Sequence, residues 1–597
     1  MMNDSFQDIV TSIMEINKEF LESLTGAGEQ MLAQHDQAWR EWKRQLATDD
    51  QPAWQKLIAA YQQEQLNFWT RLVPESMRRD PDMLESFSQV VDSRFADQEW
   101  DENPILQLLK QSYLLASKNL VSMVDALSLP PDEKRKLTFY VKHLLDALAP
   151  TNFFMTNPEA IKRAMETGGE SLVRGLENLC KDMKLGRLSM TDETAFTLGK
   201  NLAATPGAVI YENEIMQLIH YQPTTALVFD RPLLIIPPYI NKFYILDLQP
   251  HNSFVRYCLD QGYQVFLLSW VNPDQQHSEL GWDDYVEKGI LAALEVVGNV
   301  AGEKKINIVS WCIGGTLLAT ALAVLESRKK INRIASATFL TTMLDFSDPG
   351  DLGVFIDESY LESQEKKASI TGFIPGQDLF YSFSLIRANE LIWAYVAKSY
   401  LQGIDPPPFD ILYWNSDPTN QPPKLYSYFM HNMFNGNRLI EPGALRVCGI
   451  PIDLGKIKTP TYFLSTINDH IISWRTTFTA GRFLSGSRTF VLGAGGHVAG
   501  VINPPGQQKK HYWINGDEGS EPDQWLKTAT KVQGSWWTHW SRWLKRRAGK
   551  KITAPDQQGN DHYRMIEKAP GRYVSKRIDF LSCRAGDAKR DKNKGQE

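Results

Sequence analysis

The stretch INIVSWCIGGTLLATALAVL, residues 306–325, predicts the fold more strongly than any other part of the chain. Its first six residues are mostly apolar and β-branched, as in a buried strand, and its last ten are small and apolar, as in a packed helix. Cys312 lies between them, with Ser310 and Gly314 two positions away on either side. A nucleophile on a sharp strand-to-helix turn needs such small neighbours, because larger ones clash with the strained backbone. We therefore predict that Cys312 lies at such a turn.

Cys312, at the start of a helix, has the setting of a reactive thiol. The helix dipole and the free backbone N–H groups of the first turn favour a thiolate there. An inert Cys buried beside a tight turn is the alternative, since free Cys is among the most often buried residues. A reactive Cys312 requires an acid and a base later in the chain, whereas an inert buried Cys does not.

Further strand candidates surround this stretch and alternate with helical patterns. Apolar strands separated by helices indicate a parallel sheet covered by helices on both faces. Residues 345–445 interrupt the alternation with an aromatic and proline-rich segment, which we interpret as a cap inserted over the carboxyl edge of the sheet. Together these features predict an α/β-hydrolase fold with a cap subdomain. The strand candidates are residues 233–237, 264–269, 306–311, 334–340, 461–465 and 488–492, and helices are expected at 283–298 and 316–329.

The N-terminal region looks mainly helical and shows no strand-like alternation before about residue 205. Apolar residues recur there every three or four positions, as on amphipathic helices. We predict a helical N-terminal domain over residues 1–200 and a catalytic domain over residues 201–597, with a disordered polar tail from about residue 584. The helical patterns cover residues 6–24, 54–72, about 104–128 and 132–149.

An acid and a base follow Cys312 in the chain order that this fold requires, the acid first and then the histidine. Asp469 comes shortly after the strand candidate TYFLS, and His497 follows the Gly-rich end of the next one. A turn or a helix cap is an alternative role for Asp469, whereas His497 behind GAGG is harder to explain by packing. His470 is a rival base, but its adjacency to Asp469 favours a role as a neighbour near the site.

A tetrahedral intermediate at Cys312 would need two backbone donors. Ile313, directly after the nucleophile, supplies one N–H. The second is expected from the loop PPYINK at 237–242, in which neither proline carries an N–H, so Tyr239 or Ile240 is the candidate. The double proline suits a rigid loop, and it is equally consistent with a simple strand end.

Composition narrows the class of protein. A chain of 597 residues with 43% hydrophobic residues and a net charge of -6 is an ordinary multidomain globular protein without a general affinity for nucleic acid. The five Cys form no CxxC pair, which argues against a zinc ribbon or a disulfide framework and favours a reducing cytoplasm. We expect no metal and no cofactor. Because a signal pattern and membrane-length apolar runs are missing, we expect a soluble protein without a transmembrane segment.

The segment WWTHWSRW at 536–543, which the basic residues Lys545, Arg546 and Arg547 follow, has two interpretations. A surface anchor for polymer or membrane would combine aromatic and basic residues in this way. Trp536, Trp540 and Trp543 share one helical face, however, and this favours a helix that packs into the core. We prefer the core helix.

Several motifs, in order, resemble poly(3-hydroxyalkanoate) synthases. The motifs are SWCIGG at 310–315, PPYINKFYILDLQPHNSFVRY at 237–257, LTTMLDFSDPG at 340–350, YWNSDPTN at 413–420, NDHIISW at 468–474 and GGHVAGVINPP at 495–505. The similarity extends from about residue 100 to APGRYV at 569–574, and the long helical region before the catalytic part resembles the class I, single-subunit type. The family's box usually begins with Gly, and Ser310 stands in its place here.

The resemblance implies that Cys312 is the nucleophile, Asp469 the acid and His497 the base of an acyltransferase. Such an enzyme polymerises (R)-3-hydroxyacyl-CoA into poly(3-hydroxyalkanoate) and releases CoA through acyl-Cys intermediates, so that CoA is a leaving group and not a cofactor. The resemblance also implies a homodimer at the surface of cytoplasmic polyester granules, with granule-associated proteins as candidate partners. The alternatives are a thiol-dependent polyester depolymerase or esterase with the same three residues, and an inactive granule-associated protein.

The sequence alone leaves two roles undecided, that of Asp469 and that of the N-terminal domain. Asp469 either orients His497 or itself acts on the 3-hydroxyl that extends the chain. The N-terminal domain either governs association, with a second copy, with the granule surface or with granule proteins, or packs on the catalytic domain as structural support. We favour association, because the resemblance implies a dimeric enzyme on granules. The apolar cap is expected to keep water from an acyl-enzyme.

Overall fold

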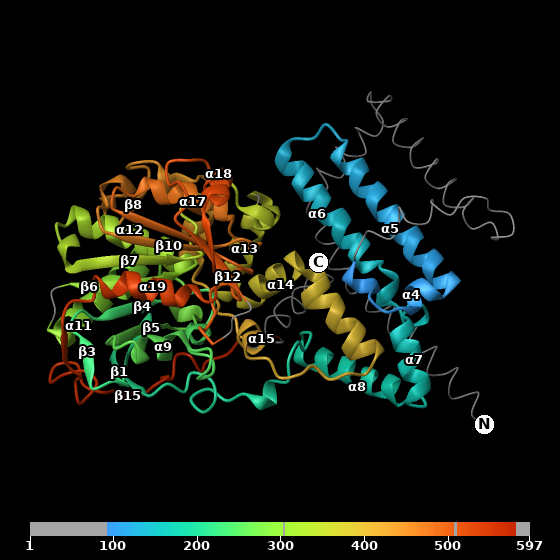
Figure 1. Ribbon diagram of the computed structural model, residues 1–597, viewed down its shortest axis with the longest axis horizontal. Helices are drawn as coiled ribbons and strands as arrows, with labels where there is room; N and C mark the ends of the chain where they lie inside the picture. Colours follow the sequence, from blue (N-terminus) through green and yellow to red (C-terminus); the bar gives the residue numbers. More distant parts are fainter. Residues whose placement is uncertain (1–91, 303–304, 357, 507–509, 579, 581–597) are drawn as a thin grey trace, which may run out of the picture. The chain divides into compact units, whose positions relative to one another are not determined.

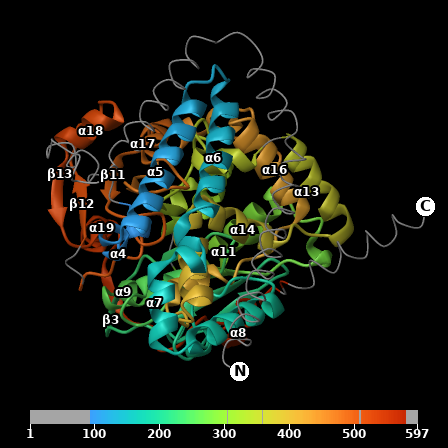
Figure 2. The same ribbon diagram turned by 90° about the vertical axis from the view of Figure 1, so that its right-hand side faces the viewer.

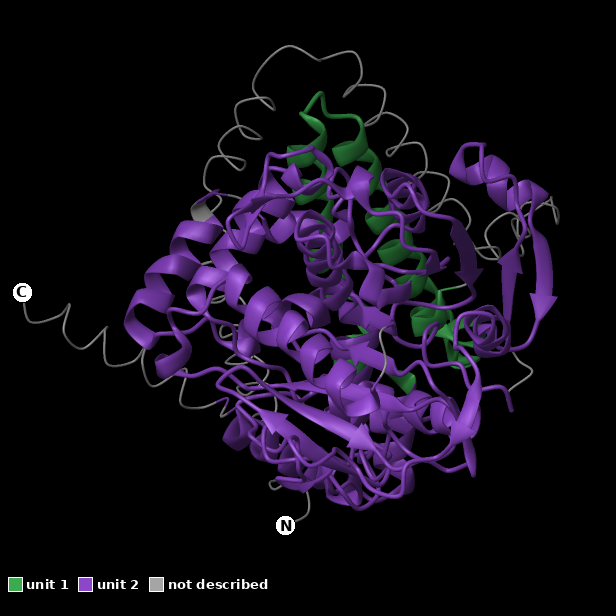
Figure 3. Ribbon diagram, turned by 90° about the vertical axis from the view of Figure 1, so that its left-hand side faces the viewer, with its two compact units in different colours: residues 1–158 green, residues 159–597 purple. Residues whose placement is uncertain are grey.

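The computed structural model describes residues 92–302, 305–356, 358–506, 510–578 and 580. Contacts between Cα atoms divide the chain into two compact units, Met1–Pro158 and Glu159–Glu597 (Figure 3). The helices expected at 6–24 and 54–72, and the tail from about residue 584, lie outside the described residues.

The division falls after Pro158, whereas the sequence predicts a domain boundary near residue 200. The reason is helix α8 (Glu170–Leu185), which packs on the helical turn η13 (Val396–Leu401). The contact is so close that a Cβ atom on Gly175 would lie 2.0 Å from the carbonyl oxygen of Tyr400. Residues 159–200 therefore pack with the second unit.

The described part of the first unit is helical, as its sequence pattern predicts, and α5 and α6 lie side by side in it (Figure 2). Asn103 begins α5: its Oδ1 accepts the N–H of Ile105 at 3.0 Å, and Pro104 occupies the first turn. Tyr113 of α5 donates its hydroxyl to the carbonyl of Leu145 in α6, 2.8 Å away, and so joins the two helices. The elements are η3 (Ser93–Phe95), α4 (Glu99–Glu102), α5 (Pro104–Asp125), α6 (Pro131–Ala147), η4 (Pro150–Asn152) and η5 (Phe154–Thr156).

The second unit is built around a mixed sheet, with the strand order β13-β12-β11-β10-β7-β6-β4-β5-β2-β1-β15 (Figure 1). The central strands from β11 to β5 run parallel, and the strands beyond them on both sides pair antiparallel. The strands are β1 (Gly207–Glu212), β2 (Met216–Tyr221), β4 (Leu233–Ile236), β5 (Val265–Trp270), β6 (Ile306–Trp311), β7 (Ile334–Leu340), β10 (Thr461–Thr466), β11 (Arg488–Gly493), β12 (His511–Ile514), β13 (Thr530–Gln533) and β15 (Glu567–Lys568). Two short ribbons pair β3 (Leu227–Phe229) with β14 (Lys551–Thr553) and β8 (Arg446–Val447) with β9 (Ile450–Pro451).

The sequence predicts all six central strands, and the predicted α/β-hydrolase architecture is confirmed. β6 and β7 have the predicted bounds, β4, β10 and β11 differ by one residue at one end, and β5 is shifted by one residue at both ends. The pattern does not predict the antiparallel edges. β12 (HYWI) and β13 (TKVQ) are too short for an alternation to stand out, and β13 is also polar. β2 is buried along its whole length despite two polar residues.

Successive residues of the central strands point to opposite faces, and each face has its own hydrophobic core. In β6, Ile308 packs in the core that contains α12, and Val309 packs in the core that contains α19. The first core is covered by α10 (Trp282–Asp284), the π-helical turn η9 (Tyr285–Leu291), α11 (Ala292–Ala301), α12 (Ile313–Ser327), α17 (Trp474–Ala480) and α18 (Pro522–Thr528), and the second by α9 (Phe254–Asp260) and α19 (Trp536–Lys545).

Helix α19 contains the Trp-rich segment, and its position decides between the two interpretations. Trp536, Trp537 and Trp540 are at most 1% exposed. The indole N–H of Trp540 donates to the hydroxyl of Thr338 in β7, 3.0 Å away. The segment is therefore a core helix, as its apolar face predicts.

The cap predicted at 345–445 lies between β7 and β10 and is helical. Its two halves are joined where Ile374 pairs with Gln421 and where the N–H of Gly376 donates to the side chain of Asn420 at 2.9 Å. The cap elements are η11 (Gly350–Phe355), α13 (Glu358–Thr371), α14 (Gly376–Ile386), η12 (Asn389–Trp393), η13 (Val396–Leu401), α15 (Asp410–Asn415), α16 (Pro423–Phe429), η14 (Met430–Asn435) and η15 (Arg438–Ile440).

Candidate active site

Cys312 lies at the turn between β6 and α12, where the sequence places it. Its φ of 53° and ψ of -129° are rare for a residue with a side chain. A Cβ atom on Gly314 would lie 2.7 Å from the carbonyl oxygen of Pro237, and one on Gly315 would lie 2.1 Å from Oγ1 of Thr342. The turn therefore requires glycine at both positions after Ile313.

Ser310 stands where the resembled family usually has Gly, and it is buried in β6. Its hydroxyl donates to the carbonyl of Thr338 on the neighbouring strand, 2.9 Å away. The buried hydroxyl has a partner, so this position tolerates Ser without an unsatisfied polar group.

Asp469 and His497 meet because β10 and β11 are parallel neighbours, paired up to Thr466 and Gly493 at their carboxyl ends. Each residue follows its strand at that edge. Nδ1 of His497 lies 2.8 Å from Oδ2 of Asp469, and the two side chains are only 6% and 1% exposed. The sequence-predicted acid and base thus form a buried, charge-assisted contact.

The carboxylate of Asp469 is held in one orientation by further donors. Its Oδ1 accepts the backbone N–H groups of Ile471 and Ile472, both at 2.9 Å. Its Oδ2, which contacts His497, also accepts the hydroxyl of Thr466 at 3.4 Å. Both oxygens are therefore occupied.

The electrostatic environment makes His497 a strong base. Burial by itself lowers the pKa of an imidazole, because desolvation disfavours the charged form. The charges of Asp469 and Cys312, and hydrogen bonds with both side chains, outweigh burial and raise the pKa of His497 from 6.5 to about 10. His497 thus interacts with the side chains of both Asp469 and Cys312, so the three residues form one cluster.

His470, the rival base, has a different environment from His497. Burial lowers the pKa of His470 to about 4, although Asp469 is its neighbour in the chain. Its Nδ1 is buried and finds no hydrogen-bond partner within the described ranges. The carboxylate of Asp469 pairs with His497 and not with the adjacent histidine.

The loop at 237–242 runs beside the first turn of α12. The carbonyl of Pro237, which leaves no room for a side chain at Gly314, accepts the indole N–H of Trp270 at 2.9 Å. The start of the loop is therefore held between the nucleophile turn and the adjacent strand β5.

The candidate oxyanion donors lie on both sides of this contact. Ile313 is the first residue of α12, so its N–H has no carbonyl partner within the helix. Tyr239 turns its ring into the core, 5.2 Å from the ring of Tyr285, whereas Ile240 lines the same pocket as Cys312. Ile240 and Ile313 thus line the same pocket as Cys312, and the choice of Tyr239 or Ile240 as the second donor stays a prediction.

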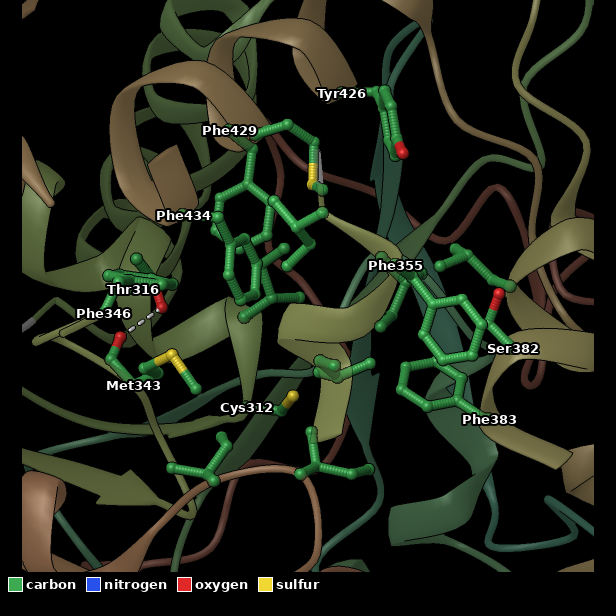
Figure 4. A pocket seen from close by; sticks show the side chains of 18 of the residues that line it. Cys312, Thr316, Met343, Phe346, Phe355, Ser382, Phe383, Tyr426, Phe429 and Phe434 are labelled. Carbon is green, nitrogen blue, oxygen red and sulfur yellow. Dashed lines mark hydrogen bonds between the residues drawn. The ribbon is translucent and has the colours of Figure 1, made fainter. Parts of the chain in front are cut away.

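An apolar pocket lies between the cap and the sheet edge, with Cys312 in its wall. Figure 4 shows the sulfur of Cys312 between Phe429 and Phe434 on one side and Phe355 and Phe383 on the other. The sequence does not single out these side chains individually, and only the aromatic composition of the cap indicates them. Lining residues are Ile240, Cys312, Ile313, Thr316, Met343, Phe346, Leu352, Phe355, Ile356, Tyr360, Leu379, Ser382, Phe383, Gln421, Tyr426, Phe429, Met430, Phe434, Ile471 and Ile472.

Three further properties concern only the part of the chain that the structure describes. Cys180, Cys258, Cys312 and Cys448 are free thiols. No group of three or more His, Cys, Asp or Glu is placed there to hold a metal ion. Within the same ranges, no helix has both the length and the apolar character that crossing a membrane requires.

Two family models match the chain. The one described as "Poly-beta-hydroxybutyrate polymerase (PhaC) N-terminus" matches residues 91–258. The one described as "alpha/beta hydrolase fold" matches residues 232–504, a range that contains Cys312, Asp469 and His497.

The chain is also similar to known proteins over most of its length. "Poly(3-hydroxyalkanoate) polymerase subunit PhaC" of Cupriavidus necator is 44% identical over 490 residues, which cover 81% of this chain and 83% of that protein. The protein of the same name from Rhizobium etli is 42% identical over 493 residues, 81% of this chain and 77% of that protein. "Poly(3-hydroxyalkanoate) polymerase 1" of Ectopseudomonas oleovorans is 38% identical over 488 residues, 81% and 87% of the two chains.

Proposed function

The chain belongs to the poly(3-hydroxyalkanoate) polymerase family, and we propose that it joins (R)-3-hydroxyacyl units from CoA thioesters into a polyester and releases CoA. The observation that carries this proposal is the position of Cys312, on a strained turn beside the buried Asp469–His497 pair and in the wall of an apolar pocket. A thiol suits acyl exchange between thioesters, because the starting and product thioesters are close in energy.

In the acylation step, His497 takes the thiol proton of Cys312, and the thiolate attacks the carbonyl carbon of the CoA thioester. The N–H of Ile313 and that of Tyr239 or Ile240 stabilise the oxyanion that forms. The bond between the carbonyl carbon and the CoA sulfur then breaks. His497 returns the proton to that sulfur, and the acyl group stays on Cys312.

In chain growth, His497 takes the proton of a 3-hydroxyl, and the hydroxyl oxygen attacks the acyl-Cys carbonyl. The bond to the sulfur of Cys312 breaks, the thiolate regains a proton from His497, and an ester bond has formed. The oxygens of Asp469 are occupied by His497 and by two backbone N–H groups. This supports an orienting role for Asp469 over direct action on the hydroxyl.

The acyl-enzyme persists only where water is kept from it. The aromatic walls of the pocket, such as Phe429 and Phe434, offer water few hydrogen-bond partners. Transfer to a bound hydroxyl is therefore favoured over hydrolysis, which weighs against a thiol-dependent depolymerase or esterase. An inactive granule-associated protein is not favoured either, because Cys312, Asp469 and His497 are all present and in contact.

The test is CoA release from a panel of (R)-3-hydroxyacyl-CoA substrates of different chain lengths, with sizing of the product. We expect CoA release accompanied by polymer for at least one chain length. Release of CoA with only free hydroxy acid as the product would show a thioesterase, and no release with any substrate would contradict the proposal.

We further propose a homodimer at the surface of cytoplasmic polyester granules, with the N-terminal region governing association. Exposed apolar side chains on the first unit support this, with Ile105 at 76%, Leu144 at 57% and Leu148 at 52% exposure. A chain that begins at residue 159 should keep the catalytic cluster and lose dimerisation or granule attachment, measured by sedimentation and by fluorescence on granules. If it stays dimeric, granule-bound and fully active, the association role is wrong.

A further inference from the structure

A cluster of buried charges lies next to the loop at 237–242, outside the catalytic cluster. Lys242 is 2% exposed and Asp417 is 1% exposed. Nε of Arg577, from the C-terminal segment, lies 3.6 Å from Oδ1 of Asp417, and Tyr244 donates its hydroxyl to Oδ2 at 3.0 Å. Moving charged side chains out of water costs free energy, so a buried cluster of charges indicates a structural or functional role.

Lys242 connects three segments that are far apart in the sequence. Its Nζ donates to the carbonyl of Lys576 at 2.7 Å, which ties the loop to the C-terminal segment. Its own carbonyl accepts the indole N–H of Trp414 at 2.7 Å, which ties the loop to the cap. The loop end that carries Lys242 is thus held from two sides.

The cap segment next to Asp417 is also hydrogen-bonded to the loop at 237–242, at the residue Ile240 that lines the pocket. Asn241 pairs with Pro418, and the N–H of Thr419 donates to the carbonyl of Ile240 at 3.3 Å. Ile240 lines the pocket together with Cys312. A shift of the segment around Asp417 would therefore move the backbone of Ile240.

Arg577 anchors this arrangement from the outside. Its guanidinium also contacts Glu193 at 3.0 Å, donates to the carbonyl of Ser416 at 3.4 Å, and lies 5.0 Å from the centre of the Tyr413 ring. Oδ1 of Asp417 makes no hydrogen bond among the described residues, so the nearby positive charges of Lys242 and Arg577 compensate it.

The charges of the cluster depend on one another. Burial lowers the pKa of Lys242 to about 8, although the charge of Asp417 opposes the change. Burial raises the pKa of Asp417, although Lys242 and Arg577 oppose it. If Lys242, Asp417 or Arg577 is lost, another charge stays buried without a partner. The loop, the cap and the C-terminal segment are therefore held together only while all three residues are present.

We propose that Lys242, Asp417 and Arg577 are positioning residues that hold the loop of Ile240 against the first turn of α12, so that its N–H groups meet the oxyanion on Cys312. The inference rests on the proposed function. Oxyanion donors act only within a fraction of an ångström of their place. The contact of Pro237 with α12 holds one end of the loop, and this cluster holds the other.

Two reactions of Cys312 in the full-length protein distinguish a role in positioning the oxyanion donors from a general effect on the whole active site. Alkylation by iodoacetamide needs the thiolate but no oxyanion donor, whereas single-turnover CoA release from (R)-3-hydroxybutyryl-CoA needs both. We expect Arg577→Ala to slow CoA release by about tenfold or more. Alkylation should stay within about twofold, because the thiolate and His497 are untouched. In steady state, kcat should fall with KM little changed.

Arg572→Ala is the matched control, because Arg572 belongs to the same C-terminal segment but pairs with Glu567 at the exposed surface. It should leave both reactions unchanged. Arg577→Lys should recover part of the rate, since lysine restores the charge but not the planar fork. If thermal unfolding shows that Arg577→Ala is not folded, the isosteric Asp417→Asn is measured in the same two reactions with the same expectation.

Equal slowing of alkylation and CoA release would overturn the proposal, because the cluster would then support the whole site. Unchanged rates in both reactions would overturn it as well. Failure of the proposed function looks different: the unsubstituted protein would be alkylated at Cys312 but would release no CoA.

Discussion

The carboxyl edge of the sheet and the cap both form the pocket, but they contribute in different ways. At the edge, Cys312, Asp469 and His497 each follow a parallel strand, so the register of β6, β10 and β11 places them. In the cap, short helices and π-helical turns present aromatic side chains that pack on one another, as Phe434 does on Phe346 at 5.0 Å between ring centres. Substitutions of the three residues at the edge should therefore abolish chemistry, whereas substitutions in the aromatic wall that the cap contributes should change the fate of the acyl group.

The largest effect is expected at the nucleophile. Cys312→Ala should lower CoA release and polymer formation by about a thousandfold or more, and the fold should persist because the change in volume is small. Cys312→Ser should be nearly as inactive, since a hydroxyl is much harder to ionise beside the same imidazole. Radiolabelled polymer and free CoA measure both variants, with circular dichroism to check folding. Substantial CoA release by either variant would remove Cys312 from its role.

The two histidines at the sheet edge give the next contrast. His497→Gln should slow acylation and chain growth by about a thousandfold, because the general base is lost. His470→Gln should cost less than about tenfold, because His470 does not pair with Asp469. CoA release is measured for both variants under the same conditions. Equal losses would leave the base unassigned, and a defect confined to His470→Gln would show that the assignment of His497 is wrong.

Asp469→Asn tests whether the carboxylate only orients the imidazole. We expect a loss of about a hundredfold, similar in single-turnover and in steady-state CoA release, because both steps use His497. The comparison of the two rates is the measurement. A much larger loss in steady state would show that Asp469 also acts on the hydroxyl of the growing chain.

A cap substitution should alter the product more than the rate. Phe434→Ala enlarges the pocket at a partly buried side chain, and water should then reach the acyl-enzyme. We expect the ratio of free hydroxy acid to polymer to rise by about threefold or more. Ile370→Ala, at a cap residue that is 60% exposed and outside the pocket, is the matched control. An unchanged product ratio in Phe434→Ala would mean that the aromatic wall does not exclude water.

The last prediction concerns the stability of the fold, where no loss of activity is involved. The pKa of His497 is about 10 in the folded protein and close to its ordinary value in the unfolded chain, so the folded state keeps a proton that the unfolded state loses. The stabilisation is complete below about pH 6.5 and declines as pH rises towards about 10, by at most about 1.4 kcal/mol per pH unit. Urea unfolding at about pH 7 and about pH 9 should show this slope, and His497→Gln should flatten it. The same slope in both proteins would contradict the raised pKa.

Local sequence patterns were sufficient for the central sheet and for the place of each catalytic candidate. An apolar run has to be buried, a sharp turn excludes large side chains, and both demands act over a few residues. For that reason INIVSW and CIGG identified β6 and the turn at Cys312. Asp469 and His497 were identified in the same way, because they follow strands whose order in the chain this fold restricts.

Other features depend on residues that are distant in the chain, and only the tertiary structure decided them. The pairing of Asp469 with His497 over His470 depends on the alignment of β10 with β11. The packing of α8 on the cap moves the boundary between the units to Pro158. The cluster of Lys242, Asp417 and Arg577 forms only where three segments meet. The physical reason is that burial and charge compensation belong to the folded surroundings of a residue, and a linear pattern contains no information on those surroundings.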